Sequence, residues 1–339
     1  MLKWRCGERF KESEMTAVEQ HSPFHAGELE VQNRIGVDER ILDIGQRVIR
    51  DHLLPQHQEF YHSQHQLLLS IVDGNGRPWV AIVAGEPGFV TALDSRRLRI
   101  NALPIGLSGA SGDEAIADLS VGGHVGVLGI DYSTRRRNRV NGRVLSVDPA
   151  GFEIQVAQSF GNCPKYIQLR DTELPQLRVW PAPPVAGVSV AALDDDWRAL
   201  IRTADHFFIA SHYDRPGDEM RHGADVSHRG GRPGFVRIDA DDVLEFPDFS
   251  GNRFYNTLGN IAANGKAALL FVDFQTGSLL SMTGEAQVVW HDALTSGFAG
   301  AERLVRFKSR EIRTYCDALP FHWRFKEQSP ALEHTGHWL

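Results

Sequence analysis

The chain has 339 residues, 42% of them hydrophobic and 23% charged, which excludes a wholly disordered or fibrous protein. Its 36 Lys and Arg against 43 Asp and Glu give a net charge of -7, which does not suit a general binder of nucleic acid or of anionic membranes. The three cysteines are too few for a disulfide framework, no apolar run reaches the roughly 18 residues of a membrane helix, and the N-terminus lacks a signal-peptide core. We therefore expect a soluble cytoplasmic protein.

The first half of the chain predicts one helix followed by many strands. Apolar residues recur at helical spacing across Asp38–Leu54, and Pro55 is expected to end that helix. Runs rich in β-branched residues predict the strands Leu67–Val72, Trp79–Val83, Phe89–Ala92, Val125–Asp131 and Val140–Val147. Turn signals such as Asp73–Gly76 and Asn141–Gly142 separate several of these runs.

A proline-rich stretch then divides the chain. Four of the 16 prolines fall within Pro175–Val190, and because proline fixes φ and lacks an N–H, this stretch predicts an extended linker. Apolar residues at helical spacing from Leu193 to Ile201, preceded by the acidic run Asp194–Asp196, predict a helix directly after it.

An internal repeat links the two halves. Val125–Val147 aligns without a gap with Ala267–Val289, and Pro87–Val90 recurs as Pro233–Val236 at almost the same offset. We interpret this as tandem duplication of a strand-rich unit. Many short strands, close turns and few helices favour antiparallel barrels over a parallel sheet, so the fold class is mainly β with a few helices.

Polar and glycine residues cluster twice in the second unit, at Asp225–Gly234 and at Phe246–Asn260. Arginine, serine and asparagine side chains and glycine amides are the groups that bind phosphate. If the span from 252 to 263 is helical, Ser250–Asn252 lies at a helix N-terminus, which is an anion-binding position. The alternative is a pair of turns with capping residues.

The motifs SHRGGRPGF, PDFSGNRFYNTLGNI and LLFVDF resemble the pyridoxamine 5′-phosphate oxidase-like, FMN-binding split-barrel superfamily, in particular its two-barrel flavin-nucleotide-binding branch. The resemblance covers roughly residues 35 to 320 and implies tandem split β-barrels with FMN at a barrel–barrel interface. The implied organisation is an N-terminal extension at 1–34, a first barrel degenerate for flavin at 35–174, a linker at 175–190, an FMN-binding barrel at 191–325 and a tail at 326–339.

The resemblance also implies the cofactor-binding residues. They are Ser227 and Arg229 for the phosphate and ring, Pro247 and Asp248 along the isoalloxazine, and Gly251, Asn252 and Arg253 as a second phosphate-binding cluster. Authentic oxidases carry adjacent Arg and Lys in that cluster and phosphate-binding residues for their substrate. This chain has Asn252–Arg253 and lacks clear equivalents of the others, which argues against vitamin B6 oxidation.

Several further residues have two interpretations. His228 either orients substrate and moves protons or hydrogen-bonds a loop. Arg137 and Arg139 either bind an anionic substrate or belong to a solvated strand pair, since alternate residues of a strand face opposite sides. Cys163 fits a structural thiol better than a nucleophile, and Gly106–Gly112 lacks a P-loop ending and predicts an exposed loop.

The leading functional interpretation is an FMN-dependent oxidoreductase acting on a small molecule, with the flavin held by the second unit. The alternative is a flavin-binding or carrier protein without turnover, which serves a separate flavin or ferredoxin reductase. The family also implies a homodimer. The 15 histidines show no metal-ligand spacing, so we expect no metal site.

Overall fold

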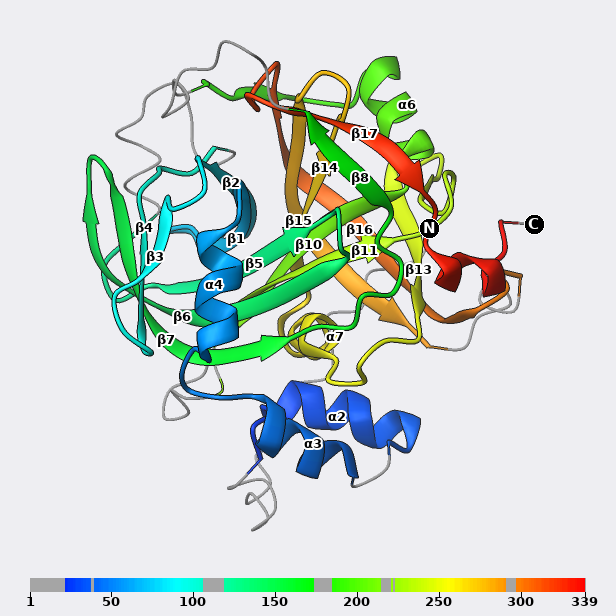
Figure 1. The fold of residues 1–339 in the computed structure, drawn as a ribbon. Coiled ribbons are helices and arrows are strands. Elements are labelled where there is room, and N and C mark those ends of the chain that lie inside the picture. The colour runs from blue at the N-terminus through cyan, green and yellow to red at the C-terminus, as the bar shows by residue number, and fades with distance from the viewer. Residues whose placement is uncertain are drawn as a thin grey trace.

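The computed structural model describes residues 22–37, 40–105, 119–173, 185–214, 221, 223–290 and 297–338, and these residues are mainly β (Figure 1). The first half contains α2 (Ala26–Ile35), α3 (Arg40–Val48), α4 (Pro55–His62), β1 (Gln66–Val72), β2 (Pro78–Ala84), β3 (Val90–Ala92), β4 (Arg97–Ile100), β5 (His124–Asp131), β6 (Arg136–Asp148), β7 (Gly151–Gly161) and β8 (Leu169–Glu173). The second contains β9 (Val188–Val190), α6 (Asp195–Thr203), β10 (His206–Tyr213), β11 (Gly223–Gly230), β12 (Arg237–Ile238), β13 (Val243–Phe249), α7 (Asn256–Asn264), β14 (Lys266–Val272), β15 (Leu279–Val289), β16 (Ala301–Tyr315), β17 (His322–Glu327) and the 3₁₀ helix η1 (Pro330–His334).

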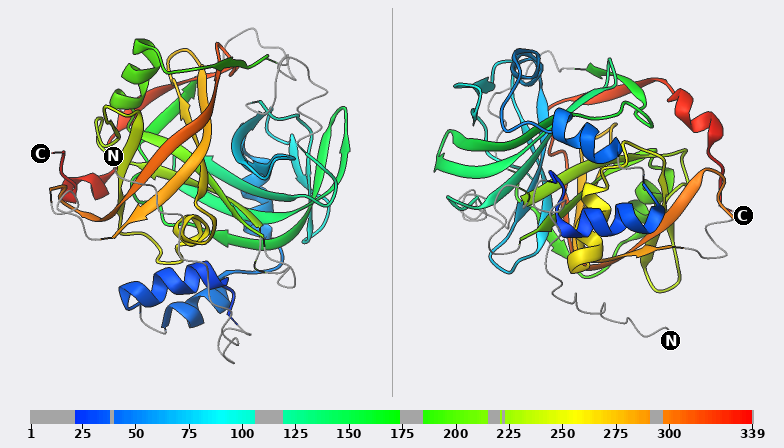
Figure 2. Two further views of the ribbon diagram at one scale, coloured as in Figure 1. Left: turned by 180° about the vertical axis from the view of Figure 1, so that it is seen from behind. Right: turned by 90° about the horizontal axis from the view of Figure 1, so that it is seen from below.

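The two main sheets have the same antiparallel topology. The first runs β2-β1-β5-β6-β7-β4-β3 and the second β11-β10-β14-β15-β16-β13-β12, so every strand of the first has a counterpart in the second, which adds β9 beside β16. The two sheets curl into barrels that lie side by side (Figures 1 and 2). The predicted fold class of tandem β-barrels is confirmed.

The duplication extends to local detail. The β6–β7 register shifts at Asn141/Gly142 and the β15–β16 register at Thr283/Gly284, which are aligned positions of the repeat. A Cβ on Gly142 would lie 2.0 Å from a backbone oxygen, and one on Gly284 would lie 2.1 Å from another, so both bulges require glycine. The expected turn at Asn141–Gly142 is therefore wrong, because the pair lies inside a strand.

The central strands are apolar on both faces because each barrel packs on the other. Along β1, Leu67 and Leu69 point into the first barrel, whereas Leu68 lies in a third core between the barrels. In β10, Phe207 points into the second barrel and Phe208 into the shared core. This alternation explains the continuous apolar runs in the sequence.

The helices differ from their predicted bounds. The helix expected across Asp38–Leu54 ends at Val48, and a separate helix begins at Pro55, a residue that suits a first turn. The helix expected from Asn252 begins at Asn256, because Arg253 and Tyr255 have left-handed φ angles of 64° and 62°. The helix after the linker forms as expected, and Asp194 caps it through the Trp197 N–H.

The segments that flank the barrels also make contacts. Helix α2 packs on α7 beneath the second barrel (Figure 1), where Gly27 and Gly259 allow close approach. β17 pairs with β8, so a strand near the end of the chain bonds to one that follows the first barrel. Gly106–Gly112 and residues 175–184 of the expected linker lie outside the described residues, whereas Val188–Val190 pairs with β16. In the described part of the chain, no helix is long and apolar enough to cross a membrane.

Candidate functional site

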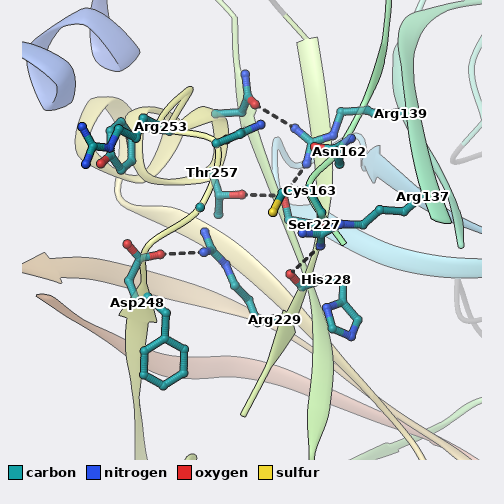
Figure 3. A pocket seen from close by; sticks show the side chains of 15 residues that line it. Arg137, Arg139, Asn162, Cys163, Ser227, His228, Arg229, Asp248, Arg253 and Thr257 are labelled. Atoms are coloured by element: carbon teal, nitrogen blue, oxygen red, sulfur yellow. Dashed lines mark hydrogen bonds and ion pairs between the residues drawn. The ribbon is translucent and has the colours of Figure 1, made fainter. Parts of the chain in front are cut away.

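A polar pocket lies between the two barrels and brings most of the predicted residues together (Figure 3). Its volume is about 90 Å³. β6 and the segment after β7 supply Arg137, Arg139, Asn162 and Cys163. The second barrel supplies Ser227, His228 and Arg229 from β11, Asp248 and Phe249 from β13, Gly251, Asn252, Arg253 and Tyr255 from the segment between β13 and α7, and Asn256 and Thr257 from the start of α7. Pro247 lines an adjoining pocket of about 60 Å³ that shares six of these residues.

Strand geometry decides which arginines of β6 reach the pocket. Arg137 and Arg139 are two residues apart and line it together, whereas the guanidinium of Arg136 lies over the Phe60 ring, 5.1 Å from its centroid. Arg135 and Arg143 donate instead to the carbonyls of other loops. The pocket thus contains the two arginines predicted for substrate together with the residues predicted for the cofactor.

Arg139 joins the two barrels at the back of the pocket. Its side chain is 4% exposed, and it donates to Asp225 Oδ1 at 3.0 Å, to Asn256 Oδ1 at 3.0 Å and to Ser227 Oγ at 2.5 Å. Burial lowers the pKa of Arg139, and the charge of Asp225 opposes that shift. Asp225 also accepts from Asn141 and Asn260, so it is fully engaged.

Asp248 is the carboxylate of the pocket wall, and two arginines share it. Arg229 Nη1 donates to its Oδ1 at 2.5 Å, and Arg303 Nη1 lies 3.4 Å from its Oδ2. Asp248 and Arg303 are both buried. Glu302 also accepts from Arg303, so two carboxylates balance these two guanidinium groups.

The pocket carries an excess of positive charge. Arg137, Arg139, Arg229 and Arg253 line it, against Asp248 alone among the lining carboxylates, with Asp225 behind. The bonds from Arg137 go to the carbonyl oxygens of Cys163, at 2.7 Å, and His228, at 3.4 Å. Burial lowers the pKa of Arg137 to about 10. Four guanidinium groups against two carboxylates suit a dianion.

The first turn of α7 opens onto the same pocket. Tyr255 precedes the helix with a left-handed φ and makes no side-chain cap, while Asn256 and Thr257 line the pocket. Ser227 Oγ lies 2.9 Å from Thr257 Oγ1. Helix N-terminal amides attract anions, and the buried Nε atoms of Arg139 and Arg229 have no hydrogen-bond partner within the described structure. The donors present exceed the acceptors that the protein supplies.

His228 is buried beside the arginines, with 5% of its surface exposed. Neither ring nitrogen has a hydrogen-bond partner among the described residues, so the loop-bonding role considered from sequence is not observed. Its ring stacks on His206 at 4.9 Å between centroids. Burial, followed by the charge of His206, lowers its pKa well below the ordinary value. His228 is therefore a neutral imidazole facing a cationic pocket.

Sequence reasoning missed several lining residues. Asn256 and Thr257 lie within a motif that was singled out, but the later helix start changes which residues face the pocket. Asn162 and Cys163 come from the other barrel, and only the packing of the barrels brings them here. The described residues contain no group of three or more potential metal-ligating side chains.

Comparison with known proteins gives structural neighbours of low identity. No family model and no curated protein matches the chain. HupZ of Group A Streptococcus is 14% identical over 36% of this chain and 92% of its own, with a TM-score of 0.28. A candidate pyridoxamine 5′-phosphate oxidase from Lactobacillus delbrueckii is 15% identical over 37% and 97%, with a TM-score of 0.29. A Clostridium acetobutylicum protein related to general stress protein 26 of B. subtilis, of the pyridoxinephosphate oxidase family, is 11% identical over 38% and 92%, with a TM-score of 0.25.

Proposed function

We propose that this chain is an FMN-binding oxidoreductase of the pyridoxamine 5′-phosphate oxidase-like type, which acts on a small molecule and holds the flavin phosphate in the pocket between its barrels. The observation that carries the proposal is the excess of arginines around an uncapped helix start, where buried donors lack partners. A phosphate dianion would satisfy these donors and balance their charge.

The pocket fits FMN in its donor set. Ser227, Thr257 and the guanidinium groups of Arg139 and Arg229 suit the phosphate. The adjoining pocket adds the apolar surfaces of Pro247, Phe249 and Tyr166, which suit a planar ring. When bound, a flavin supplies hydride or electron transfer at its own ring.

The protein's part is binding and orientation. The Arg139–Asp225 pair fixes the guanidinium in place, because a buried pair with four further hydrogen bonds has little freedom to move. His228 is neutral at physiological pH and offers a ring nitrogen as acceptor. It would accept a hydrogen bond from a substrate group held beside it.

The second candidate is a flavin carrier that is reduced by a separate flavin or ferredoxin reductase. The small volume of the pocket favours it, since about 90 Å³ suits the phosphate end of a cofactor and leaves no space for a separate substrate beside it. Oxidation of NAD(P)H by the purified yellow protein alone supports the oxidoreductase. Oxidation only after a reductase is added supports the carrier.

The decisive test is the visible spectrum of the purified protein, with flavin released by heating. We expect yellow protein that releases FMN. The double variant Arg229→Ala with Asn252→Ala should lower FMN affinity about 10- to 100-fold, since a charge-assisted hydrogen bond contributes about 1.5–3 kcal/mol. Arg136→Ala is the matched control, because Arg136 lies next to a lining arginine but contacts Phe60. Colourless wild-type protein that binds no added FMN would refute the proposal.

The homodimer is proposed on the family resemblance alone. The lining residues of the pocket all come from one chain, so dimerisation is not needed to assemble them. Light scattering measures the mass of the flavin-loaded protein. A monomer with full flavin occupancy would contradict the proposed dimer and would leave the pocket assignment intact.

A further inference from the structure

Cys163 opens onto the arginine pocket and not into a core. It is half-buried and lines both the main pocket and the adjoining one, together with Arg137, His228 and Arg229 (Figure 3). The structural thiol expected from sequence would lie among apolar side chains, and Cys163 belongs to none of the apolar clusters of the described chain. Its thiol has access to any solute that enters the pocket.

The segment that carries Cys163 is held in place from several sides. Arg137 Nε donates to the Cys163 carbonyl at 2.7 Å, and the Tyr166 hydroxyl donates to the Ser250 carbonyl of the second unit at 3.1 Å. Gly230 lies so close to Tyr166 that an added Cβ would stand 2.0 Å from its carbonyl oxygen. The position of the thiol relative to the arginines is therefore set by the fold.

The surroundings of Cys163 are electropositive. The side chain of Arg137 donates to the carbonyl oxygens of Cys163 and His228, and Arg229 lines both pockets with the thiol. Lys165 lines the adjoining pocket beside it. Reactive cysteines occur in partly exposed, electropositive surroundings of this kind, where cations attract anionic reagents.

A second observation indicates that a ligand belongs beside the thiol. His228 is 5% exposed, lines both pockets with Cys163, and has two ring nitrogens without partners among the described residues. Arg139 is 4% exposed, and its Nε has no hydrogen-bond partner either. An anionic group bound in this pocket, which Cys163 also lines, would give these unpartnered side chains a hydrogen-bond partner.

We propose that Cys163 is a thiol–disulfide exchange site for small anionic disulfides. The Cys163 thiolate attacks one sulfur of the bound disulfide, the disulfide bond breaks, a new S–S bond forms to Cys163, and the other half leaves as a thiolate. No further oxidant or reductant takes part. The attached anionic group occupies the arginine pocket, so the modified protein loses its capacity to bind phosphate there.

The experiment compares two thiol reagents on two single-cysteine proteins. Cys6→Ser with Cys316→Ser retains Cys163, and Cys6→Ser with Cys163→Ser retains the exposed Cys316. The anionic reagent is 5,5′-dithiobis(2-nitrobenzoate) and the neutral one is 4,4′-dithiodipyridine. We expect the anionic-to-neutral rate ratio to be about tenfold higher at Cys163, because nearby cations concentrate the anion. Equal ratios at the two cysteines would overturn the proposal.

Two further measurements separate this site from the flavin proposal. Arg137→Gln should reduce the rate ratio at Cys163 about fivefold or more, since it removes the nearest charge without opening a large void. Inorganic phosphate should slow modification of Cys163 but not of Cys316, whether or not the protein ever binds flavin. Modification that phosphate and Arg137→Gln leave unchanged would contradict the proposed role of the arginines, whereas colourless protein that still shows phosphate protection would count only against FMN.

Discussion

The two faces of the barrel–barrel interface are equivalent in strand register but opposite in chemistry. Leu68 pairs with Leu128 and Ile82 in the first barrel as Phe208 pairs with Leu270 and His228 in the second, which aligns the two sheets residue by residue. The polar residues of the pocket then have register counterparts in the other unit, which are Leu279 for Arg137, Ser281 for Arg139, Ala81 for Ser227, Ile82 for His228 and Val83 for Arg229. Leu279 and Ile82 lie in the core between the barrels, whereas Ala81 and Val83 lie in the core of the first barrel. Apolar residues stand at four of these five positions.

The second face is filled by side chains of the shared core. Ile105, Ala318, Leu319 and Phe321 pack there against Ile82 and Leu279. The duplicated fold thus provides equivalent positions twice. In this chain one set is mostly apolar and packs in the cores, and the other set lines the polar pocket.

The largest expected effect tests the energetic asymmetry of the two faces. Arg139→Ala should lower the free energy of unfolding by about 3–5 kcal/mol, because it leaves the buried Asp225 without its cation. Ser281→Ala, at the equivalent position, should cost less than about 1 kcal/mol, since its hydroxyl makes one long hydrogen bond of 3.5 Å. Urea denaturation measures both. Similar losses would mean that the faces do not differ energetically.

The next effect should be equal in both barrels. Gly142→Ala and Gly284→Ala each force a methyl group against a backbone oxygen at the duplicated bulge. We expect each substitution to lower the free energy of unfolding by about 1–3 kcal/mol, with the two values agreeing closely. Thermal unfolding checks this. A loss confined to one barrel would show that the bulge is not structurally equivalent in the two units.

Acid should lower the free energy of unfolding through His228, whose counterpart Ile82 does not titrate. The pKa of His228 is lowered by burial, so the unfolded chain takes up a proton near pH 6.5 that the folded chain refuses. This contribution to stability is complete above that pH and is lost as pH falls. Replacement by the equivalent residue, His228→Ile, should reduce the loss between about pH 6 and pH 5 by about 1 kcal/mol. An unchanged pH profile would contradict burial of a neutral histidine.

The smallest effect concerns an arginine on the same strand that does not reach the pocket. Arg143 donates to the Gly122 carbonyl at 2.9 Å, away from the polar face. Arg143→Ala should change the affinity for phosphate less than about twofold, whereas Arg137→Ala should weaken it about tenfold. Titration calorimetry with inorganic phosphate compares them. Equal weakening would indicate general charge attraction in place of a defined site.

Sequence patterns predicted the features that depend on the spacing of nearby residues. The repeat and the strand runs came directly from residue spacing, and the matched topologies agree with them. The helix start at Asn256 was not predictable, because Arg253 and Tyr255 adopt left-handed backbone angles that are uncommon for arginine and tyrosine. The pair Asn141–Gly142 is a turn signal in most contexts and marks a bulge here.

The candidate site was predictable only within one unit. Ser227, Arg229 and Asp248 could be grouped because their motifs stand close together in the sequence. That Arg137 and Cys163 join them depends on the packing of one barrel on the other, which no local pattern encodes. The sequence shows that the arginine-rich strand of the first unit is polar, but it does not show which of its arginines line the pocket.

Covalent linkage of the two barrels has a consequence for how such a protein can change over generations. In a two-fold assembly of identical subunits, any substitution at the interface appears on both faces at once. Here Leu279 and Arg137 are encoded by separate codons although they occupy equivalent positions. One face could therefore become hydrophobic and strengthen the assembly without any loss of charge on the other. A gene duplication followed by fusion turns a symmetry constraint into two independently inherited sites.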